Sequence, residues 1–460
     1  MFILKPLDII RDPVHHYIEL TEIEKELIDS PEFQRLRYIK QLPGAFYVYP
    51  GATHTRFEHS LGTMHLAGEI AETLLRSEWK NSDKEEKAEI EKQIQKIRIA
   101  ALLHDIGHGP FSHVFEFMAF EGFNHEDFGR EISQSLLRRT ILNGAQRRKT
   151  TESAESYGFE EKDIDDICKW AFEKYSGEKD KYPFEIVADR ENKLDADKFD
   201  YLLRDAYYTG TVEYGVADIR RLIINSALAE VKKGCRQRCF NLRVKLALSD
   251  IWLARYEMFS AVYYHRTARS AELLLAQILK ALDEELDISD VIKHKKVREF
   301  LKLTDDILNY ARRLPESNRA RKLVEKLDKR ELYKPVEERK FVERDAYKII
   351  SLKEYKRREE EAIAEIAGVS PDCIMLDTPH VDVPFYPGAY STVYFVNDEG
   401  EPMPIPPEEL LPFRTEGRIE LTLRIYTTEP EVADKVRKAF LTWLQEKGLE
   451  SSEPFSGRSI

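Results

Sequence analysis

Residues 101–113 read ALLHDIGHGPFSH, so that an apolar run ends in His104 and Asp105 and two further histidines follow. Burying an unpaired carboxylate beside an imidazole costs free energy comparable to the stability of a small domain, so a partner for these groups is expected. Seven of the twelve histidines of the chain fall between residues 54 and 125. Imidazole and carboxylate together suit a transition metal, and positions left open to water would make the site catalytic.

Two other segments offer ligands to the same ion. RFEHS places His59 on a preceding helix, and KLDADKFDYLLRDAYYTG supplies a further group of acidic residues. On that second helix Asp197, Tyr201 and Asp205 fall at i, i+4 and i+8 and line one face, with Lys198 beside them. This stripe suits a phosphorylated ligand, although ordinary salt bridges along a helix explain it equally well. The order of the ligands along the chain favours a metal site over a satisfied core.

The composition predicts a soluble, globular, cytoplasmic protein. Its 460 residues are 42% hydrophobic and 33% charged, and this length exceeds what one core supports, so two or three lobes are expected. No apolar run is long enough to span a bilayer, and the N-terminal segment does not read as a signal peptide. The formal net charge of −12 argues against a nucleic-acid partner, so a polyphosphate ligand requires a local cluster of Arg, Lys and His.

The elements that must position these residues are mostly helical. Apolar periodicity predicts helices over 22–41 (broken at Ser30 and Pro31), 56–76, 82–107, 195–209 and 250–282, and a charged helical region over 289–365. Alternating segments at 373–379, 391–398 and 419–429 predict strands, followed by a helix over 430–447. The sequence therefore predicts a mainly α fold, divided into a helical core (1–285), a charged helical region (286–370) and a small α/β lobe (371–460).

Taken together, these motifs resemble the HD-domain phosphohydrolases, and most closely their deoxynucleoside triphosphate triphosphohydrolase branch. That branch includes a vertebrate enzyme with an added SAM domain. The resemblance runs from about Ile10 to His265 through RDPVHHYIEL, DSPEFQRLRYIKQLPGAFYVYPGATHTRFEHSLG, LLHDIGHGPFSH, NHE and DADKFDYLLRD. It implies an HD-domain helical core, and no SAM domain is expected because these motifs begin near the N-terminus.

The resemblance also implies a set of roles. His59, His104, Asp105 and Asp197 would bind the metal, which could be Fe, Mn, Ni, Co or Zn, with Mg on the phosphates. Arg56, His108, His113, His125, Lys198 and Tyr201 would contact the triphosphate, with Asp195 near it. Gln41 and Asp205 would read the 3′-hydroxyl, and Leu42 and Tyr263 would close the space at C2′, with Tyr264 as an alternative to Tyr263.

The implied reaction converts a deoxynucleoside triphosphate to a deoxynucleoside and inorganic triphosphate. The metal would activate a water for attack on the α-phosphorus while neighbouring cations stabilise the developing charge. His113, oriented by Glu116, would protonate the 5′-oxygen, with His125 as the alternative. The family more often has Asp in place of Glu116. Two other hypotheses stay open: an HD phosphohydrolase for another nucleotide or phosphoester, and a metal-binding regulatory module without significant turnover.

A second nucleotide site is also implied. Asp29, Gln34 and Arg37 match positions that recognise guanine in an activating site, where nucleotide binding assembles a tetramer. A guanine nucleotide activator and a homo-oligomer, dimer or tetramer, are therefore expected partners. A structural explanation competes, because Asp29 could cap a helix and Arg37 could form a surface pair. In addition, Asp8 stands near the place where the family has a basic residue.

Overall fold

The computed structural model describes residues 3–120, 122–142, 158–177, 180–214, 218–341, 356–378, 392–397, 399–410, 421–449 and 453–454. Most of these residues are helical, which confirms the prediction of a mainly α fold with a smaller part that contains strands. Within the described residues, no helix combines the length and apolar character that a membrane span requires.

Four helices carry most of the candidate residues. α3 (Arg56–Asn81) and α4 (Lys84–Leu103) pack along each other, α9 (Ala196–Thr209) packs on α3, and α5 (His125–Leu137) lies on α7 (Glu161–Phe172). Asp83 caps α4 in a capping box with Glu86, which satisfies free backbone N–H groups at the helix start. The exposed charged half of α4 then passes into the fully buried IRIAALL turns, so the helix delivers His104 and Asp105 to the interior.

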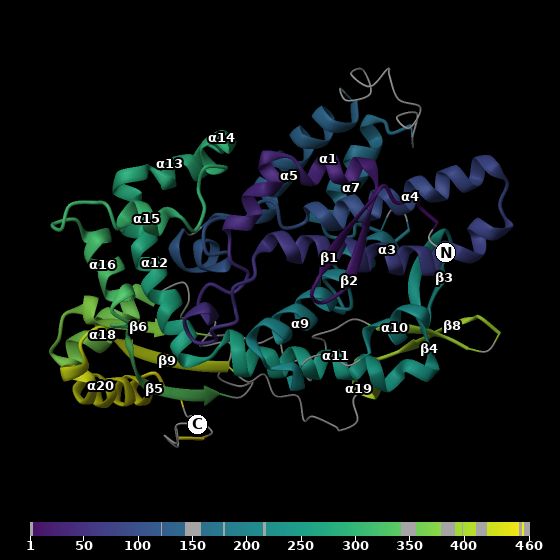
Figure 1. Ribbon diagram of the computed structural model, residues 1–460. Coiled ribbons are helices and arrows are strands. Elements are labelled where there is room, and N and C mark those ends of the chain that lie inside the picture. The colour runs from purple at the N-terminus through teal and green to yellow at the C-terminus, as the bar shows by residue number, and fades with distance from the viewer. Residues whose placement is uncertain are drawn as a thin grey trace.

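The remaining helices are α1 (Glu22–Ile28), α2 (Pro31–Gln34), α8 (Tyr182–Val187), α10 (Ile219–Ile224), α11 (Lys245–Met258), α12 (Arg266–Leu286), α13 (Ile288–Lys293), α14 (Val297–Phe300), α15 (Ile307–Ala311), α16 (Arg319–Asp328), α18 (Lys356–Ala367), α19 (Pro407–Leu410) and α20 (Ala433–Glu446). Figure 1 shows that α13 to α16, α18 and α20 lie together toward one end of the molecule. Two π-helical turns, η3 (Phe115–Ala119) and η7 (Phe259–Tyr263), also border the site.

The predicted single helix over 250–282 is wrong. α11 ends at Met258, η7 follows, and α12 begins only at Arg266, where the His265 side chain accepts from the backbone N–H of Thr267. The carbonyls at the break are bonded by a distant strand: Arg424 Nη1 donates to Tyr264 O at 2.6 Å, and Tyr426 OH donates to Arg266 O at 3.1 Å. Tertiary contacts therefore override a local helical preference.

Three small sheets are present in the described residues. β1 (Asp8–Asp12) and β2 (His16–Leu20) form an antiparallel hairpin, with Asp12 opposite His16. The second sheet has the order β3-β4-β7-β8, and the third has the order β10-β5-β9-β6. Their bounds are β3 (Ser226–Lys232), β4 (Cys235–Asn241), β5 (Lys334–Phe341), β6 (Ile374–Asp377), β7 (Val393–Val396), β8 (Pro402–Ile405), β9 (Leu421–Thr427) and β10 (Glu453–Pro454).

The predicted C-terminal strands are confirmed as β6, β7 and β9, and the closing helix as α20. Residues 379, 391, 398 and 419–420 of the predicted strands, and 342–355 of the predicted helical region, lie outside the described residues. The wholly helical prediction for 289–365 is wrong, because β5 lies there and pairs with β9. Since β4 also pairs with β7, strand pairing crosses residues 285 and 370, and the three-part division remains a proposal.

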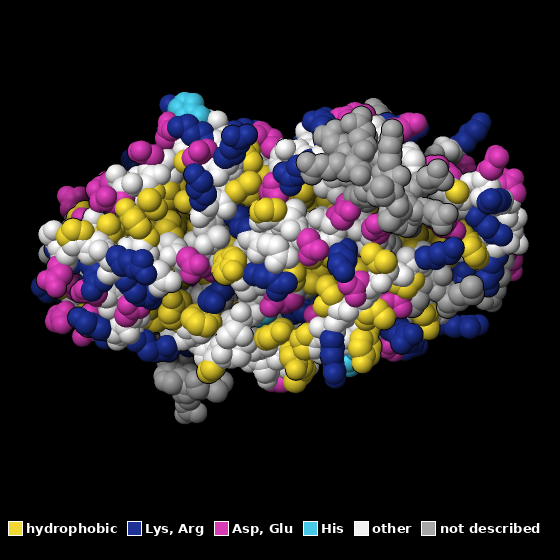
Figure 2. Space-filling model, turned by 45° about the horizontal axis from the view of Figure 1, so that its top comes forward, with side chains coloured by type: hydrophobic (Ala, Val, Ile, Leu, Met, Phe, Trp, Pro, Cys, Tyr) yellow, Lys and Arg dark blue, Asp and Glu magenta, His cyan; other side chains and the backbone are white. Residues whose placement is uncertain are grey.

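Two hydrophobic cores underlie this arrangement. The large core runs through α3, α4, α9, α11 and α12. The smaller one lies between the β5-β9-β6 sheet and helices α18 and α20, with Phe440 and Trp443 among its members. Figure 1 shows this sheet and its two helices at one end of the molecule, far from α4. On the face shown in Figure 2, acidic and basic side chains are interspersed.

Candidate active site

Four predicted metal ligands meet at one corner. His59 comes from the first turn of α3, His104 and Asp105 from the end of α4, and Asp197 from the first turn of α9. His59 Nε2 lies 3.2 Å from Asp197 Oδ1 and 3.5 Å from Asp105 Oδ2. His104 Nε2 lies 3.4 Å from Asp105 Oδ1 and 3.6 Å from Asp197 Oδ1. Each carboxylate therefore faces both imidazoles, and three segments distant in sequence form one donor set.

The two imidazoles are arranged as metal ligands. His59 Nε2 and His104 Nε2 are both buried and have no hydrogen-bond partner among the described residues. The opposite nitrogens are bonded: His59 Nδ1 to Asp200 at 2.8 Å, and His104 Nδ1 to Ala101 O at 2.7 Å. Bonding at Nδ1 fixes the tautomer and presents the Nε2 lone pair to an ion. These buried nitrogens beside two carboxylates fit a divalent metal.

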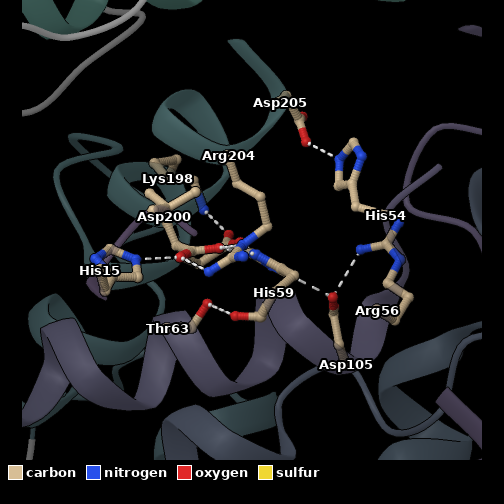
Figure 3. Close-up of polar contacts among 12 residues, drawn as sticks. His15, His54, Arg56, His59, Thr63, Asp105, Lys198, Asp200, Arg204 and Asp205 are labelled. Carbon is tan, nitrogen blue, oxygen red and sulfur yellow. Dashed lines mark hydrogen bonds and ion pairs between the residues drawn. The ribbon is translucent and has the colours of Figure 1, made fainter. Parts of the chain in front are cut away.

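A buried charged network supports His59 from behind (Figure 3). Asp200 binds His59 with one oxygen and His15 Nε2, at 2.6 Å, with the other. Arg204 lies against Asp200, with Nε to Oδ2 at 2.9 Å, and also binds Asp12 at the hairpin. Gly62 makes room for this carboxylate, because a Cβ there would lie 1.8 Å from Asp200 Oδ1.

Cations line the wall beside the metal corner. Arg56 donates to Asp105 at 2.7 Å and to Ser112 at 2.9 Å, and His108 Nε2 lies 3.3 Å from Asp105. Burial would raise the pKa of Asp105, but Arg56 and the neighbouring histidines hold it well below its usual range. The carboxylate therefore stays ionised as a ligand.

Lys198 stands on the other side of the corner. Its Nζ lies 2.7 Å from Asp197 and 3.1 Å from Asp195. Asp195 is fully buried and caps α9, accepting from the backbone N–H of Lys198 at 2.8 Å and of Asp189 at 2.6 Å. Its place in the structure is thus the start of α9, where it holds Lys198 toward the site.

His113, His125 and Glu116 form the third group. Glu116 accepts from His125 Nδ1 at 2.8 Å and lies 3.7 Å from His113 Nδ1. The sequence predicts that Glu116 orients His113, but the carboxylate lies closer to His125 than to His113. The His113 side chain is 55% exposed and that of His125 18%. His125 stacks on His108, with ring centroids 4.1 Å apart, so these imidazoles border one space.

The residues predicted to face the sugar gather around Asp205. His54 Nε2 lies 2.7 Å from Asp205 Oδ1, and Tyr263 OH donates to Oδ2 at 2.7 Å. Gln41 is buried with an unpartnered Oε1, and its backbone N–H donates to His54 O at 3.1 Å. The predicted pair Gln41 and Asp205 is thus linked through His54, a residue that was not assigned a role from the sequence.

Most of these groups open on one cavity of about 1410 Å³, whereas His59, Glu116 and Asp195 lie behind its wall. Its wall includes 13 of the predicted residues: Gln41, Leu42, Arg56, His104, Asp105, His108, His113, His125, Asp197, Lys198, Tyr201, Asp205 and Tyr263. Tyr264 and Arg255 also line it, as do residues of β6, among them Asp377. The C-terminal part therefore shares a wall with the metal corner.

Comparison with known families agrees with this geometry. A family model described as HD domain matches residues 56–204, the span that contains the whole metal corner. The chain contains an HD domain. A second model, described as HD associated region, matches residues 243–448. The HD domain thus supplies the metal corner, while Tyr263 comes from the associated region.

Named relatives support the same family. The chain is 32% identical over 346 residues to the deoxynucleoside triphosphate triphosphohydrolase SAMHD1 homolog of Dictyostelium discoideum, covering 73% of this chain and 61% of the relative. It is 34% identical over 365 residues to an uncharacterized protein of Methanocaldococcus jannaschii, covering 75% and 65%. It is 30% identical over 356 residues to human deoxynucleoside triphosphate triphosphohydrolase SAMHD1, covering 72% and 55%. The chain thus spans less than two thirds of each of these relatives.

The three residues predicted to bind a guanine nucleotide lie outside the HD-domain span, on α1, α2 and the turn after them. Asp29 is exposed at the C-terminal end of α1, and the helix cap expected of it is supplied by Ser30, which accepts from Phe33 N at 3.3 Å. Arg37 donates to Gln34 Oε1 at 2.8 Å and lies 3.5 Å over the Phe57 ring. Gln34 and Arg37 are therefore neighbours that bind each other in this structure.

Proposed function

We propose that this HD-domain protein is a metal-dependent phosphohydrolase that converts deoxynucleoside triphosphates to deoxynucleosides and inorganic triphosphate. The observation that carries the proposal is the single cavity in which a metal corner, a wall of cations and a sugar-facing carboxylate follow one another. The names of the relatives from Dictyostelium discoideum and human support the same substrate class.

His59, His104, Asp105 and Asp197 would hold the ion. A divalent metal there would supply Lewis acidity and an activated water at neutral pH. The donor set accepts Fe, Mn, Ni, Co or Zn, and Mg would suit the phosphate oxygens. Asp200 keeps His59 in the required tautomer, and Arg56 keeps Asp105 ionised. Both residues therefore prepare the metal site before substrate binds.

The triphosphate would lie along Arg56, His108, His125 and Lys198. Arg56 and Lys198 supply the local positive charge that an acidic chain requires, and the imidazoles add hydrogen-bond donors. Contacts with Asp105 hold Arg56 and His108, Asp197 holds Lys198, and Glu116 holds His125. Fixed donors stabilise charge that develops on phosphate oxygens. Tyr201 lines the same wall, and Asp195 acts on the phosphates only through Lys198.

The departing 5′-oxygen requires a proton. His113 and His125 both border the cavity, and imidazole is the side chain that most often acts as a general acid. We retain His113 as the acid because its exposed ring can approach a ligand from the open side. His125, which Glu116 orients more closely, is the alternative.

Specificity for a deoxyribose would arise at the other end of the cavity. Asp205 is held by His54 and Tyr263, and its remaining lone pairs would accept the 3′-hydroxyl together with Gln41. Leu42 and the ring of Tyr263 would fill the space at C2′, so that a 2′-hydroxyl would be excluded sterically.

Product analysis tests the reaction. Purified protein loaded with Mn, Fe, Co, Ni or Zn would be incubated with mixed deoxynucleoside triphosphates, with and without GTP. Release of deoxynucleoside and triphosphate supports the proposal. A GTP dependence would assign Asp29, Gln34 and Arg37 to an activator site, and light scattering would test the proposed dimer or tetramer. Absence of turnover with every metal would favour another phosphoester or a regulatory role.

A further inference from the structure

The backbone between His108 and His113 has an unusual conformation. Phe111 and Ser112 have φ angles of 59° and 52°, although neither is glycine. Residues with a side chain seldom adopt this left-handed region, and it persists where surrounding contacts enforce it. Two hydrogen bonds form within the loop, Ser112 N to Gly109 O and Val114 N to Phe111 O, both at 3.0 Å. Neither uses the backbone N–H of Phe111, which donates to a partner outside the loop.

That partner is Asp305, which lies between α14 and α15, outside the HD domain. Its Oδ1 accepts from the backbone N–H of Phe111 at 2.7 Å, and its Oδ2 accepts from the backbone N–H of Lys40 at 2.9 Å. Its own N–H donates to Tyr38 O at 3.0 Å. One carboxylate thus joins the loop that carries His113 to the segment that precedes Gln41.

A second residue fixes the same three segments. Arg35 donates through Nη1 to His108 O at 2.8 Å and through Nη2 to Leu303 O at 2.7 Å. Its guanidinium is buried, 4.8 Å over the ring of Phe300. The segment that bears Asp305 is therefore anchored independently of the carboxylate, so a substitution that weakens the carboxylate's hydrogen bonds does not release the segment.

We propose that Asp305 is a positioning residue, which holds the 109–113 loop so that His113 faces the cavity. The proposal rests on the proposed function for its catalytic consequence. The two loops depend on Asp305 unequally. Residues 39–41 are also bonded to residues 54–56, by Gln41 N to His54 O at 3.1 Å and Arg56 N to Ile39 O at 2.9 Å. The 109–113 loop is instead bonded through the Ser112 side chain, which accepts from Arg56 Nε at 2.9 Å and donates to Lys40 O at 2.7 Å. Loss of the carboxylate therefore frees the backbone N–H of Phe111 in particular, and it affects the chemical step more than substrate affinity.

The test is Asp305→Asn in the full-length, metal-loaded protein. The amide retains one acceptor oxygen but presents N–H to the second backbone N–H, so one of the two bonds is lost. The matched control is Asp306→Asn. Among the described residues, the exposed carboxylate of Asp306 accepts a hydrogen bond only within its own helical segment, from Asn309 at 3.3 Å. We expect kcat to fall about 10- to 100-fold, as for other small displacements of catalytic groups, with KM within about threefold and metal content unchanged.

Hydrogen exchange gives a readout that is independent of substrate. In Asp305→Asn the amide of Phe111 should exchange at least about tenfold faster, while amides in α3 and α9 keep their protection. Unchanged exchange at Phe111, or an equal loss of kcat in Asp306→Asn, would overturn the proposal. In the wild-type protein the Phe111 amide should be protected despite its place in a loop, and rapid exchange there would also overturn it. A wild type without activity on deoxynucleoside triphosphates would count against the proposed function, and exchange alone would then decide the role of Asp305.

Discussion

Asp200 Oδ2 lies 2.8 Å from His59 Nδ1, on the side of the ring opposite the unpartnered Nε2. Asp200 is not itself a proposed metal ligand, and its carboxylate is bonded to His15 and Arg204. The N-terminal hairpin is thereby connected to the metal corner, because Arg204 also binds Asp12.

The first prediction concerns this contact. Asp200→Asn should weaken metal affinity about 10- to 100-fold, because a carboxylate behind a ligating histidine fixes its tautomer and raises its basicity. Isothermal titration with Mn or Zn measures the change, and saturating metal should restore most of the activity. Asp250→Asn, at an exposed position on α11, should bind metal as the wild type does. Wild-type affinity in Asp200→Asn would contradict the assignment.

The second prediction concerns the metal ligand His104. His104→Ala should abolish turnover and remove the thermal stabilisation that metal gives the wild type, about 2.7 kcal/mol at a free concentration one hundred times Kd. Differential scanning calorimetry with and without metal measures it. His294→Ala is the control, since that histidine is exposed and pairs only with Asp290 in the described part of the chain. A metal-dependent shift that survives in His104→Ala would exclude this residue as a ligand.

The third prediction separates the two candidate acids. His113→Ala should leave metal binding intact and lower kcat by about 10²- to 10⁴-fold, the usual contribution of general acid catalysis. A substrate with a more acidic leaving group than a 5′-hydroxyl should be hydrolysed with a much smaller loss. If His113→Ala retains most of its activity and His125→Ala does not, the acid is His125.

The fourth prediction concerns stability at the shared wall of the cavity. Asp377 of β6 binds Arg269 of α12 at 2.6 Å, and both side chains are largely buried. Arg269 also binds Glu272 at 2.7 Å, so Asp377→Ala leaves the guanidinium with one carboxylate partner. The free energy of unfolding should therefore fall by about 1.5–3 kcal/mol, the usual contribution of hydrogen bonds to a charged group. Asp372→Ala breaks only the exposed pair with Arg357 and should cost less than about 1 kcal/mol. Urea denaturation compares the two.

The same pair predicts a pH dependence. Burial opposes the charge on Asp377, but Arg269 lowers its pKa below the usual value of 3.8. A depressed folded-state pKa contributes stability that is present above the unfolded value and is lost as the pH falls through the folded value. Burial raises the pKa of the neighbouring Glu272 to about 7, so the comparison is made below about pH 5, where Glu272 is already protonated. There the difference in unfolding free energy between the wild type and Asp377→Ala should shrink as the solution becomes more acidic. A difference that does not depend on acidity would contradict the ion pair.

The cluster of four proposed ligands could be predicted from the sequence because each lies in a clearly helical context. His59 lies in the first turn of α3, His104 and Asp105 follow the buried half of α4, and Asp197 lies in the first turn of α9. In such cases local periodicity fixes the direction of each side chain, and the chemical types limit what can meet. The stripe of Asp197, Tyr201 and Asp205 on α9 is likewise present, and all three line the cavity.

The supporting residues were missed because their roles depend on tertiary contacts. Asp200 and Arg204 stand within DKFDYLLRD, and only packing against α3 shows that they face His59. The β3 and β4 hairpin carried a signal that was not used, since Lys233 and Gly234 separate two alternating segments and Gly234 has a φ of 74°. Asp305 gave no local signal, because its partners are backbone amides about 190 and 260 residues away.

Part of the cavity wall comes from the HD-associated region, so the residues of the metal corner do not form the cavity by themselves. Residues 56–204 hold every proposed ligand of the ion, but Asp205, Tyr263 and Asp305 all lie beyond that span. The regions matched over 56–204 and 243–448 each supply only part of the cavity wall. An HD segment excised at 56–204 would therefore be expected to bind the ion but to lack the other residues that the proposed reaction requires.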